Sequence, residues 1–344
     1  MVSQFSEKTI DAFITPVVGR TPKFRKSMSA IINAILAART LRISSIAHAM
    51  KANYETAYRR ITRFLNEFDD HDMVLQRMLC DNVPFLIADP TIIDRPEAEK
   101  TKYVGLVRPE RRGFYLLTIA APFKGRALPV MIHDYSPATI ADECSSRNIE
   151  HTAALEKIKD IAGETPIIFD REFSYAKLLE DFESEGLHYV IRLNTKNHVK
   201  LTDSNGATVE LSIGHGERKT WSGLFYKGKI KVNVAAVWKT GFKSPLFVVT
   251  SLEDADQAID LYLQRMKIEL MFRDLKSEMG VDKNMSMKRE NMQKLIVLAM
   301  LAYTMAALVG EKVRETHYDQ KKEPAIATSL SFSLFVTNGI NWLI

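Results

Sequence analysis

Two short apolar segments that each end in an aspartate constrain the fold of this chain most. PFLIAD ends at Asp89, and TPIIFD ends at Asp170. Each apolar run is too short for a core helix and is typical of a buried strand. An aspartate at the end of a buried strand lies at the rim of a sheet, where α/β folds bind ligands. Aspartates at such positions also begin turns or cap helices, so the position alone does not assign a function.

The segments around these aspartates predict an α/β core over residues 81–193. FYLLTIAAPF and ALPVMIHDY, separated by the turn residues KGR, predict a hairpin of buried strands. After Asp170, SYAKLLEDFESEG predicts a helix closed by Gly186, and LHYVIRL predicts the next strand. Strands followed by an alternation of strand and helix indicate an α/β fold.

The remainder of the chain predicts a strand-rich insertion and then helices. Residues 194–252 contain many lysines and the turn signals Asn205-Gly206 and Lys227-Gly228. Residues 253–315 predict two long helices, and the tail over 316–344 stays unassigned. The apolar run LIVLAMLAYTMAALV is shorter than the ~20 residues of a membrane span. We therefore expect a buried core helix there and no membrane partner.

Charge is distributed unevenly along the chain. The net charge is only +5, and 46% hydrophobic with 26% charged residues excludes a disordered or collagen-like chain. Residues 20–65 have a net charge of +9, from ten basic residues and one acid, and residues 192–244 have +7, from ten and three. Residues 66–99 have −7, from two basic and nine acidic residues. The pattern favours a polyanion partner, although an unevenly charged solvated surface would look the same.

The first basic block lies in a predicted helical domain, residues 1–80. A short helix in LRISSIAHAM, capped by Ser44 or Ser45, the connector KANYET and the helix TAYRRITRFL follow the order of a helix-turn-helix. A plain helical bundle with a basic face would give the same order. In a helix-turn-helix, the residues that would face DNA are Arg59, Arg60 and Arg63.

Cysteine usage and the N-terminus predict a cytoplasmic protein. Cys80 and Cys144 are far apart and show no metal-ligand spacing, so we expect reduced thiols. The N-terminal MVSQFSEKTIDAF has no apolar core of a secretory signal. No phosphate-binding glycine motif is present, so no nucleotide cofactor is expected.

The segment LYLQRMKIELMFRDLKSEMG predicts a helix with a narrow polar stripe between apolar flanks. At about 100° per residue, Tyr262, Arg265, Glu269 and Lys276 share an arc of roughly 60°, which Arg273 extends. A packed helix of this kind presents one carboxylate among cations, although an i,i+4 ion pair of Arg265 with Glu269 would explain part of the stripe. Three carboxylates, two at strand ends and one on this helix, suit two divalent cations about 4 Å apart.

The spacing Tyr262-x2-Arg265-x3-Glu269-x6-Lys276 matches the Y-R-E-K signature of the insertion-sequence-4 family of bacterial transposases, which the chain resembles over about residues 20–315. LIADPT and IIFDREF, followed by HYVIRL, are similar to the two Asp motifs of that family. One departure is Glu172, which adds a carboxylate where the family commonly has glycine. Asp94 is an alternative to Asp89, which is preferred because it directly follows the clearer strand.

The resemblance implies an RNase H-like core, an N-terminal DNA-binding domain and a β-strand insertion before the glutamate helix. It implies that Asp89, Asp170 and Glu269 are catalytic and bind two Mg²⁺ or Mn²⁺ ions. It also implies that a homodimer on paired DNA ends cleaves the terminal inverted repeats and joins the 3′ ends to target DNA. The cations and aromatic residues that would contact this DNA include Tyr262, Arg265, Lys276, Arg273 and, in the insertion, Trp221, with Trp238 as its alternative.

Two other functions fit parts of the sequence. A transposase-derived DNA-binding protein would keep the helical domain and no longer cleave DNA, but it would have no need of the three carboxylates. An RNase H-fold nuclease would hydrolyse DNA without strand transfer, and the sequence does not separate it from a transposase.

Overall fold

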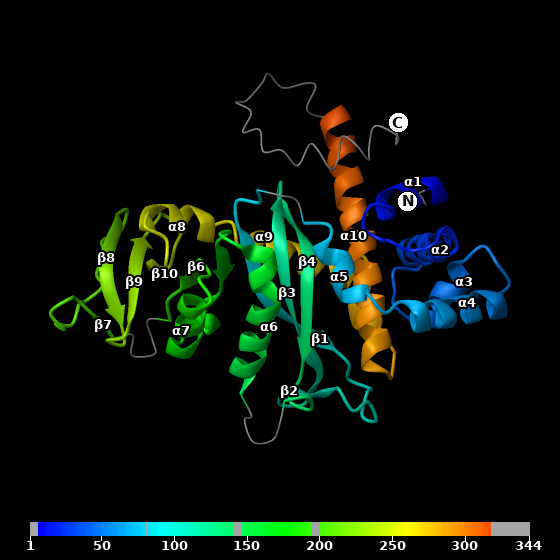
Figure 1. Ribbon diagram of the computed structural model, residues 1–344, viewed down its shortest axis with the longest axis horizontal. Coiled ribbons are helices and arrows are strands. Elements are labelled where there is room, and N and C mark those ends of the chain that lie inside the picture. Colours follow the sequence, from blue (N-terminus) through cyan, green and yellow to red (C-terminus); the bar gives the residue numbers. More distant parts are fainter. Residues whose placement is uncertain (1–5, 80–81, 141–145, 195–199, 318–344) are drawn as a thin grey trace.

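The computed structural model describes residues 6–79, 82–140, 146–194 and 200–317 (Figure 1). A single mixed sheet runs through the molecule, and the N-terminal helices lie beside the long helix α10 at one end of it (Figure 1). The strands of the insertion lie at the opposite end (Figure 1). Cys80, Cys144 and the tail beyond residue 317 lie outside the described residues.

The N-terminal basic block folds as helices. Their bounds are α1 (Glu7–Ile14), α2 (Pro22–Ala38), α3 (Ile43–Ala49), α4 (Tyr54–Glu67) and α5 (His71–Gln76). The side chain of Asn53 caps α4 by accepting a hydrogen bond from the Glu55 amide. The predicted cap of the preceding helix is wrong, because α3 begins at Ile43 and places Ser44 and Ser45 inside its first turn.

The core sheet is built from strands β1 to β6. Their bounds are β1 (Leu86–Asp94), β2 (Gly105–Arg108), β3 (Arg111–Phe123), β4 (Arg126–Tyr135), β5 (Ile167–Phe169) and β6 (Tyr189–Arg192). The order β4-β3-β1-β5-β6 has β3 antiparallel to both neighbours, whereas β5 is parallel to β1 and β6. The predicted hairpin of buried strands is confirmed as β3 and β4, with Lys124 in its turn at φ 49°.

Helices cover both faces of this sheet. The connections around β5 contain α6 (Arg147–Ala162), the 3-10 turn η1 (Arg171–Phe173) and α7 (Ala176–Ser184). One apolar cluster packs α6 and α7 against one face of the sheet. A second cluster joins the other face to α10 and the N-terminal helices. The predicted α/β core is therefore present as a mixed sheet between two helical layers.

The insertion extends the same sheet. Its strands are β7 (Leu201–Thr202), β8 (Arg218–Tyr226), β9 (Ile230–Val237) and β10 (Leu246–Thr250), in the order β10-β9-β8-β7 beyond β6. The predicted turn at Lys227-Gly228 is confirmed as the β8–β9 turn, with φ values of 50° and 71°. The Lys229 amide bonds the Tyr226 carbonyl at 3.2 Å, and the two central residues of this turn both have positive φ, which suits the twist of a hairpin.

The first of the two long helices predicted over residues 253–315 is broken into α8 (Ala255–Tyr262) and α9 (Met266–Ser277). At the break the Arg265 amide bonds the Tyr262 carbonyl at 3.0 Å, and the Ile268 amide bonds the Arg265 carbonyl at 3.1 Å. These i→i+3 bonds tighten the chain into a 3-10 turn. The 3-10 turn η2 (Val281–Lys283) follows α9.

The last described helix, α10 (Arg289–His317), is long and apolar enough to cross a membrane by length and composition. In the fold, 72% of its most apolar window is buried. It packs between the N-terminal helices and the sheet, as the apolar run predicted for a core helix.

Candidate active site

The register of β1 and β5 places the two predicted aspartates side by side. Ala88 lies opposite Phe169 in this parallel pair of strands. Asp89 and Asp170 are the next residues along their respective strands, so they lie side by side. The prediction that Asp89 ends its strand is wrong, because β1 continues to Asp94 by pairing with the long β3. Asp89 lies instead at the level where the parallel neighbour β5 ends, so its side chain still reaches the rim formed there.

The break between α8 and α9 brings the polar stripe to these aspartates. The Tyr262 hydroxyl, at the end of α8, donates a hydrogen bond to Asp170 Oδ1 at 3.1 Å. Arg265, which precedes α9, donates from Nη1 to Asp89 Oδ2 at 3.0 Å. Its Nη2 also donates to Glu269, so the predicted i,i+4 pair is present. The structure thus sets Asp170 beside Asp89 and links Glu269 to Asp89 through Arg265.

The electrostatics of the cluster are dominated by burial. Burial raises the pKa of Asp89 to about 7, against the opposing effect of Arg265 and with further increases from nearby carboxylates, Asp170 first. Burial, followed by the charge of Asp170, raises the pKa of Tyr262 to about 12. The carboxylates, Asp89 first, raise the pKa of Arg265 in spite of its burial. The site therefore holds a fixed cation between carboxylates whose mutual repulsion is only partly offset.

The two remaining cations of the stripe separate in the structure. Lys276 lines the cleft beside the aspartates, and its ammonium group donates to the Ile92 carbonyl at 2.6 Å. Arg273 has a side chain that is 63% exposed and lies 3.5 Å from Asp274, outside that cleft. The geometry includes Lys276 in the site and leaves Arg273 on the surface of α9.

The geometry also distinguishes Asp89 from Asp94. Both oxygens of Asp94 accept hydrogen bonds from Arg111, at 2.5 and 2.6 Å, and this contact lowers the Asp94 pKa. Asp94 lies five residues along the strand from Asp89, which corresponds to about 17 Å. Asp94 is therefore a partner of Arg111 and is remote from Asp170.

A cleft of about 660 Å³ adjoins the carboxylates. Its charged lining consists of Asp89, Asp170, Glu172, Arg108, Arg111, Arg147 and Lys276. Glu172 follows one of the predicted aspartates in sequence, whereas the three arginines come from β2, β3 and α6 and form no motif with the carboxylates. Burial raises the pKa of Glu172, although Arg147 lies 3.6 Å away and opposes that effect.

The three predicted arginines of α4 have different environments. Arg59 and Arg63 have side chains that are 84% and 60% exposed. Arg60 donates to the Ser27 hydroxyl at 3.2 Å and to the Lys26 carbonyl at 2.9 Å. Arg60 therefore fastens α4 to α2, whereas the other two present their charge to solvent.

The aromatic candidates of the insertion are both partly buried. The ring centres of Trp221, on β8, and Phe247 are 6.4 Å apart. The ammonium of Lys219 lies 4.9 Å from the centre of the Trp221 ring. The Trp238 indole nitrogen donates to the Phe242 carbonyl at 3.1 Å. Trp238 thus has a structural hydrogen bond, and Trp221 keeps a cation beside its ring.

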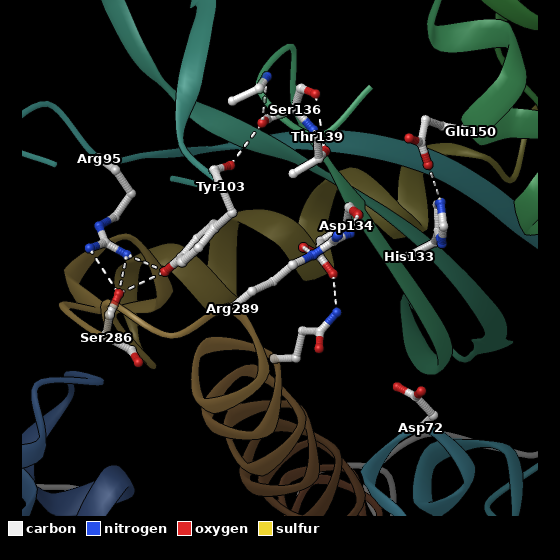
Figure 2. A network of polar contacts seen from close by, with 12 residues as sticks. Asp72, Arg95, Tyr103, His133, Asp134, Ser136, Thr139, Glu150, Ser286 and Arg289 are labelled. Atoms are coloured by element: carbon white, nitrogen blue, oxygen red, sulfur yellow. Dashed lines mark hydrogen bonds and ion pairs between the residues drawn. The ribbon is translucent and has the colours of Figure 1, made fainter. Parts of the chain in front are cut away.

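A network of polar contacts holds the segment that links α9 to α10 (Figure 2). Arg289, the first residue of α10, donates from Nε to the buried Asp134 of β4 at 2.8 Å. Arg95 and Tyr103 both donate to the Ser286 carbonyl, the tyrosine at 2.7 Å. These contacts fix the segment between α9 and α10 against β4 and the connection that follows β1.

Comparisons with known proteins bear on the family of this chain. No match was found among curated proteins. A solved structure with a similar chain is the cryo-EM structure of the piggyBac transposase synaptic complex with hairpin DNA, with 9% sequence identity and a TM-score of 0.45. That alignment covers 96% of this chain and 86% of the other. The family model described as a transposase DDE domain matches residues 84–305, well over half of the chain. The chain therefore belongs to the transposase DDE domain family.

Proposed function

We propose that this protein is a metal-dependent DNA transposase that cleaves the ends of its element and joins the 3′ ends to target DNA. The proposal rests on the register of β1 and β5, which sets Asp89 beside Asp170, with Glu269 tied to Asp89 through Arg265. Membership of the DDE family supports a transposase that acts on DNA. The Y-R-E-K spacing supports the narrower assignment to the insertion-sequence-4 family.

We also infer that the core is RNase H-like. The order β4-β3-β1-β5-β6, with β3 antiparallel and β5 parallel to β1, supports this inference. Two aspartates at neighbouring strand positions and a glutamate on a later helix suit such a core. The insertion continues this sheet beyond β6 and would hold Trp221 and its lysines beside bound DNA.

The donor set suits hard divalent cations. Carboxylate oxygens are the ligands that Mg²⁺ and Mn²⁺ prefer, and Asp89, Asp170 and Glu269 would hold two such ions. Among the described residues, no three His, Cys, Asp or Glu side chains already lie close enough to hold an ion. The Arg265 guanidinium lies between Asp89 and Glu269, where a metal ion would bind. It would have to release one of these carboxylates when the ion binds. Divalent cations bound there would neutralise charge on the phosphoryl group and activate the attacking oxygen.

The remaining polar groups would position the DNA strand. The Tyr262 hydroxyl, already directed at Asp170, and the guanidinium of Arg265 would hydrogen-bond a phosphate at the carboxylates. Lys276 would hold a phosphate at the other end of the β1 segment, near Ile92. Fixing a phosphate beside three carboxylates supplies the alignment on which phosphoryl transfer depends.

The N-terminal helices would recognise the terminal inverted repeats. Arg59 and Arg63 on α4 present exposed cations, whereas Arg60 is engaged within the protein. A cytoplasmic homodimer on two paired DNA ends would bring two such surfaces and two active sites together. The +9 charge of residues 20–65 supports a DNA-facing role for this region.

A cleavage assay with a matched carboxylate variant tests the proposal. The purified protein is incubated with Mg²⁺ and a labelled duplex that carries the terminal repeat flanking its gene. We expect end cleavage that Glu269→Gln abolishes while DNA binding persists. Glu278→Gln removes a carboxylate from the end of the same helix, where it pairs with Arg39 at 3.1 Å, and should keep cleavage.

Each alternative function gives a different result. Specific binding without metal-dependent cleavage by the unaltered protein would indicate a transposase-derived DNA-binding protein. Cleavage without strand-transfer or hairpin products would indicate a plain nuclease. Equal cleavage by the Glu269→Gln variant would refute the assigned carboxylates.

A further inference from the structure

We propose that Arg108 and Arg147 form a phosphate-binding subsite in the cleft beside the carboxylates. The ligand would be a backbone phosphate of the bound DNA strand, about three nucleotides from the phosphate that is cleaved. The inference rests on the proposed function and adds two residues that lie outside the Y-R-E-K stripe. Both side chains line the cleft that contains Asp89 and Asp170.

Arg147 is held in place from two sides. Its guanidinium lies 5.2 Å from the centre of the Tyr115 ring and 3.6 Å from Glu172 Oε2. Tyr115 is itself fixed, because its hydroxyl donates to the Val107 carbonyl at 2.9 Å and its ring stacks on Tyr135. An arginine stacked on a fixed ring keeps the rest of its planar fork free for bidentate recognition of a phosphate.

Arg108 supplies a second cation on the same wall. It ends β2, is exposed, and has no ion pair within the part of the chain that the structure describes. The nearby Arg111 differs, because both oxygens of Asp94 accept its hydrogen bonds. Arg108 is therefore a cleft cation whose charge is available to an anionic ligand.

The spacing along β1 fits a DNA strand. From Asp89 to Ile92 the strand advances three residues, or about 10 Å. One strand of DNA advances about 3.4 Å per nucleotide, so this length corresponds to roughly three nucleotides. Ile92 pairs with Tyr115, over whose ring Arg147 lies. A strand with its cleaved phosphate at Asp89 would thus place a phosphate about three nucleotides away beside Arg147.

The charge of the cleft favours such a subsite. Asp89, Asp170 and Glu172 all repel a phosphodiester that approaches along the cleft, and Arg265 is already engaged with two carboxylates. Arg108 and Arg147 would offset this repulsion without contacting the reacting phosphate. The subsite would therefore act on binding and positioning of the strand.

Salt-dependent DNA binding tests the subsite. Arg108→Gln, Arg147→Gln and the control Arg112→Gln are compared on the terminal-repeat duplex by fluorescence anisotropy over a range of salt concentrations. Arg112 follows Arg111 on β3 and does not line the cleft, because successive side chains of a strand lie on opposite faces. Its substitution therefore removes one positive charge, as the subsite variants do, but outside the cleft. Each subsite variant should lower the salt slope by about 0.9 and weaken binding about tenfold. The control should change neither quantity.

Single methylphosphonates locate the phosphate and its source. They replace, one at a time, the phosphates around the cleavage position in the end duplex and, in a separate series, those of a target duplex. A methylphosphonate at the position that contacts the subsite should weaken DNA binding by the unaltered protein. The same methylphosphonate should not weaken DNA binding by Arg108→Gln any further. The series in which that position occurs identifies the source of the bound phosphate.

The outcomes separate the subsite from the proposed function. If the end duplex is bound and cleaved but the two subsite variants match Arg112→Gln, the subsite is refuted and the function stands. If the unaltered protein neither binds nor cleaves the end duplex, the proposed function fails and the subsite fails with it. Arg147→Lys retains the charge beside Glu172 and should keep the salt slope, and the exposed Arg108 can be replaced without a change in folding.

Discussion

Replacing Asp89 by asparagine should stabilise the metal-free protein at high pH. Burial raises the pKa of Asp89 to about 7 from an ordinary value of 3.8. Between these two values the folded protein holds a proton that the unfolded chain has released. The free energy of unfolding therefore falls as pH rises through this window, by about 1.4 kcal/mol per pH unit. Above pH 7 the accumulated loss is about 4 kcal/mol.

An asparagine side chain in place of Asp89 would carry no charge and would escape this loss. Asp89→Asn should therefore gain up to about 4 kcal/mol at pH 8, and the gain at pH 8 should exceed that at pH 5 by ~2–3 kcal/mol. Arg265 keeps Glu269 as a partner in the variant, so its guanidinium does not become a lone buried charge. Urea unfolding of both proteins at the two pH values, in the presence of a chelator, measures the difference.

Asp94→Asn is a matched control on the same strand. Its expected change in the free energy of unfolding at pH 8 has the opposite sign. The contact with Arg111 lowers the Asp94 pKa, so this pair stabilises the fold above pH 3.8 and its contribution is lost as pH falls further. Since the Asp94 side chain is 35% exposed, its replacement should cost only about 0.2–1 kcal/mol at pH 8. An Asp89→Asn gain of equal size at pH 5 and pH 8, or a loss at pH 8, would refute burial as the dominant effect.

Three further substitutions, with Gly186→Ala as a control for one of them, test backbone geometry and buried contacts of the fold, each by urea unfolding. Gly280→Ala should cost more than about 2 kcal/mol, because φ is 62° and a Cβ would lie 2.4 Å from the Arg39 carbonyl oxygen, whereas Gly186→Ala, in open space at φ 66°, should cost about 1 kcal/mol. Lys227→Asn should gain about 0.5–1 kcal/mol, since asparagine tolerates the φ of 50° in the β8–β9 turn. Asp134→Asn should cost about 2–3 kcal/mol, because it removes the buried charge that anchors the start of α10.

The strands of the core are predictable because short-range signals specify them. The apolar runs, the KGR turn and the Lys-Gly turn each depend on neighbours in sequence, and the structure has β3, β4, β8 and β9 at those places. The end of β1 depends instead on how far β3 extends beside it. The residues around Asp89 do not indicate that β3 pairs with this strand, so the sequence predicts that the strand ends at Asp89.

The site itself is only partly predictable, for a similar reason. The spacing of Arg265 and Glu269 within one segment identifies a pair that the structure confirms. Arg108 and Arg147 reach the cleft from β2 and α6, whose placement depends on packing between distant parts of the chain. No pattern in either local sequence distinguishes these arginines from ordinary surface cations.

The break between α8 and α9 explains why a stripe calculated for a continuous helix still identifies the groups that meet. In an α-helix Arg265 would lie about 60° away from Tyr262 around the helix axis. The i→i+3 bonds of the break bring residues three apart onto the same line, because a 3-10 turn has three residues per turn. Tyr262 can then reach Asp170 while Arg265 reaches Asp89 on the neighbouring strand. Glu269 lies one α-helical turn beyond Arg265, so the helix that resumes there carries the third carboxylate back to the same guanidinium.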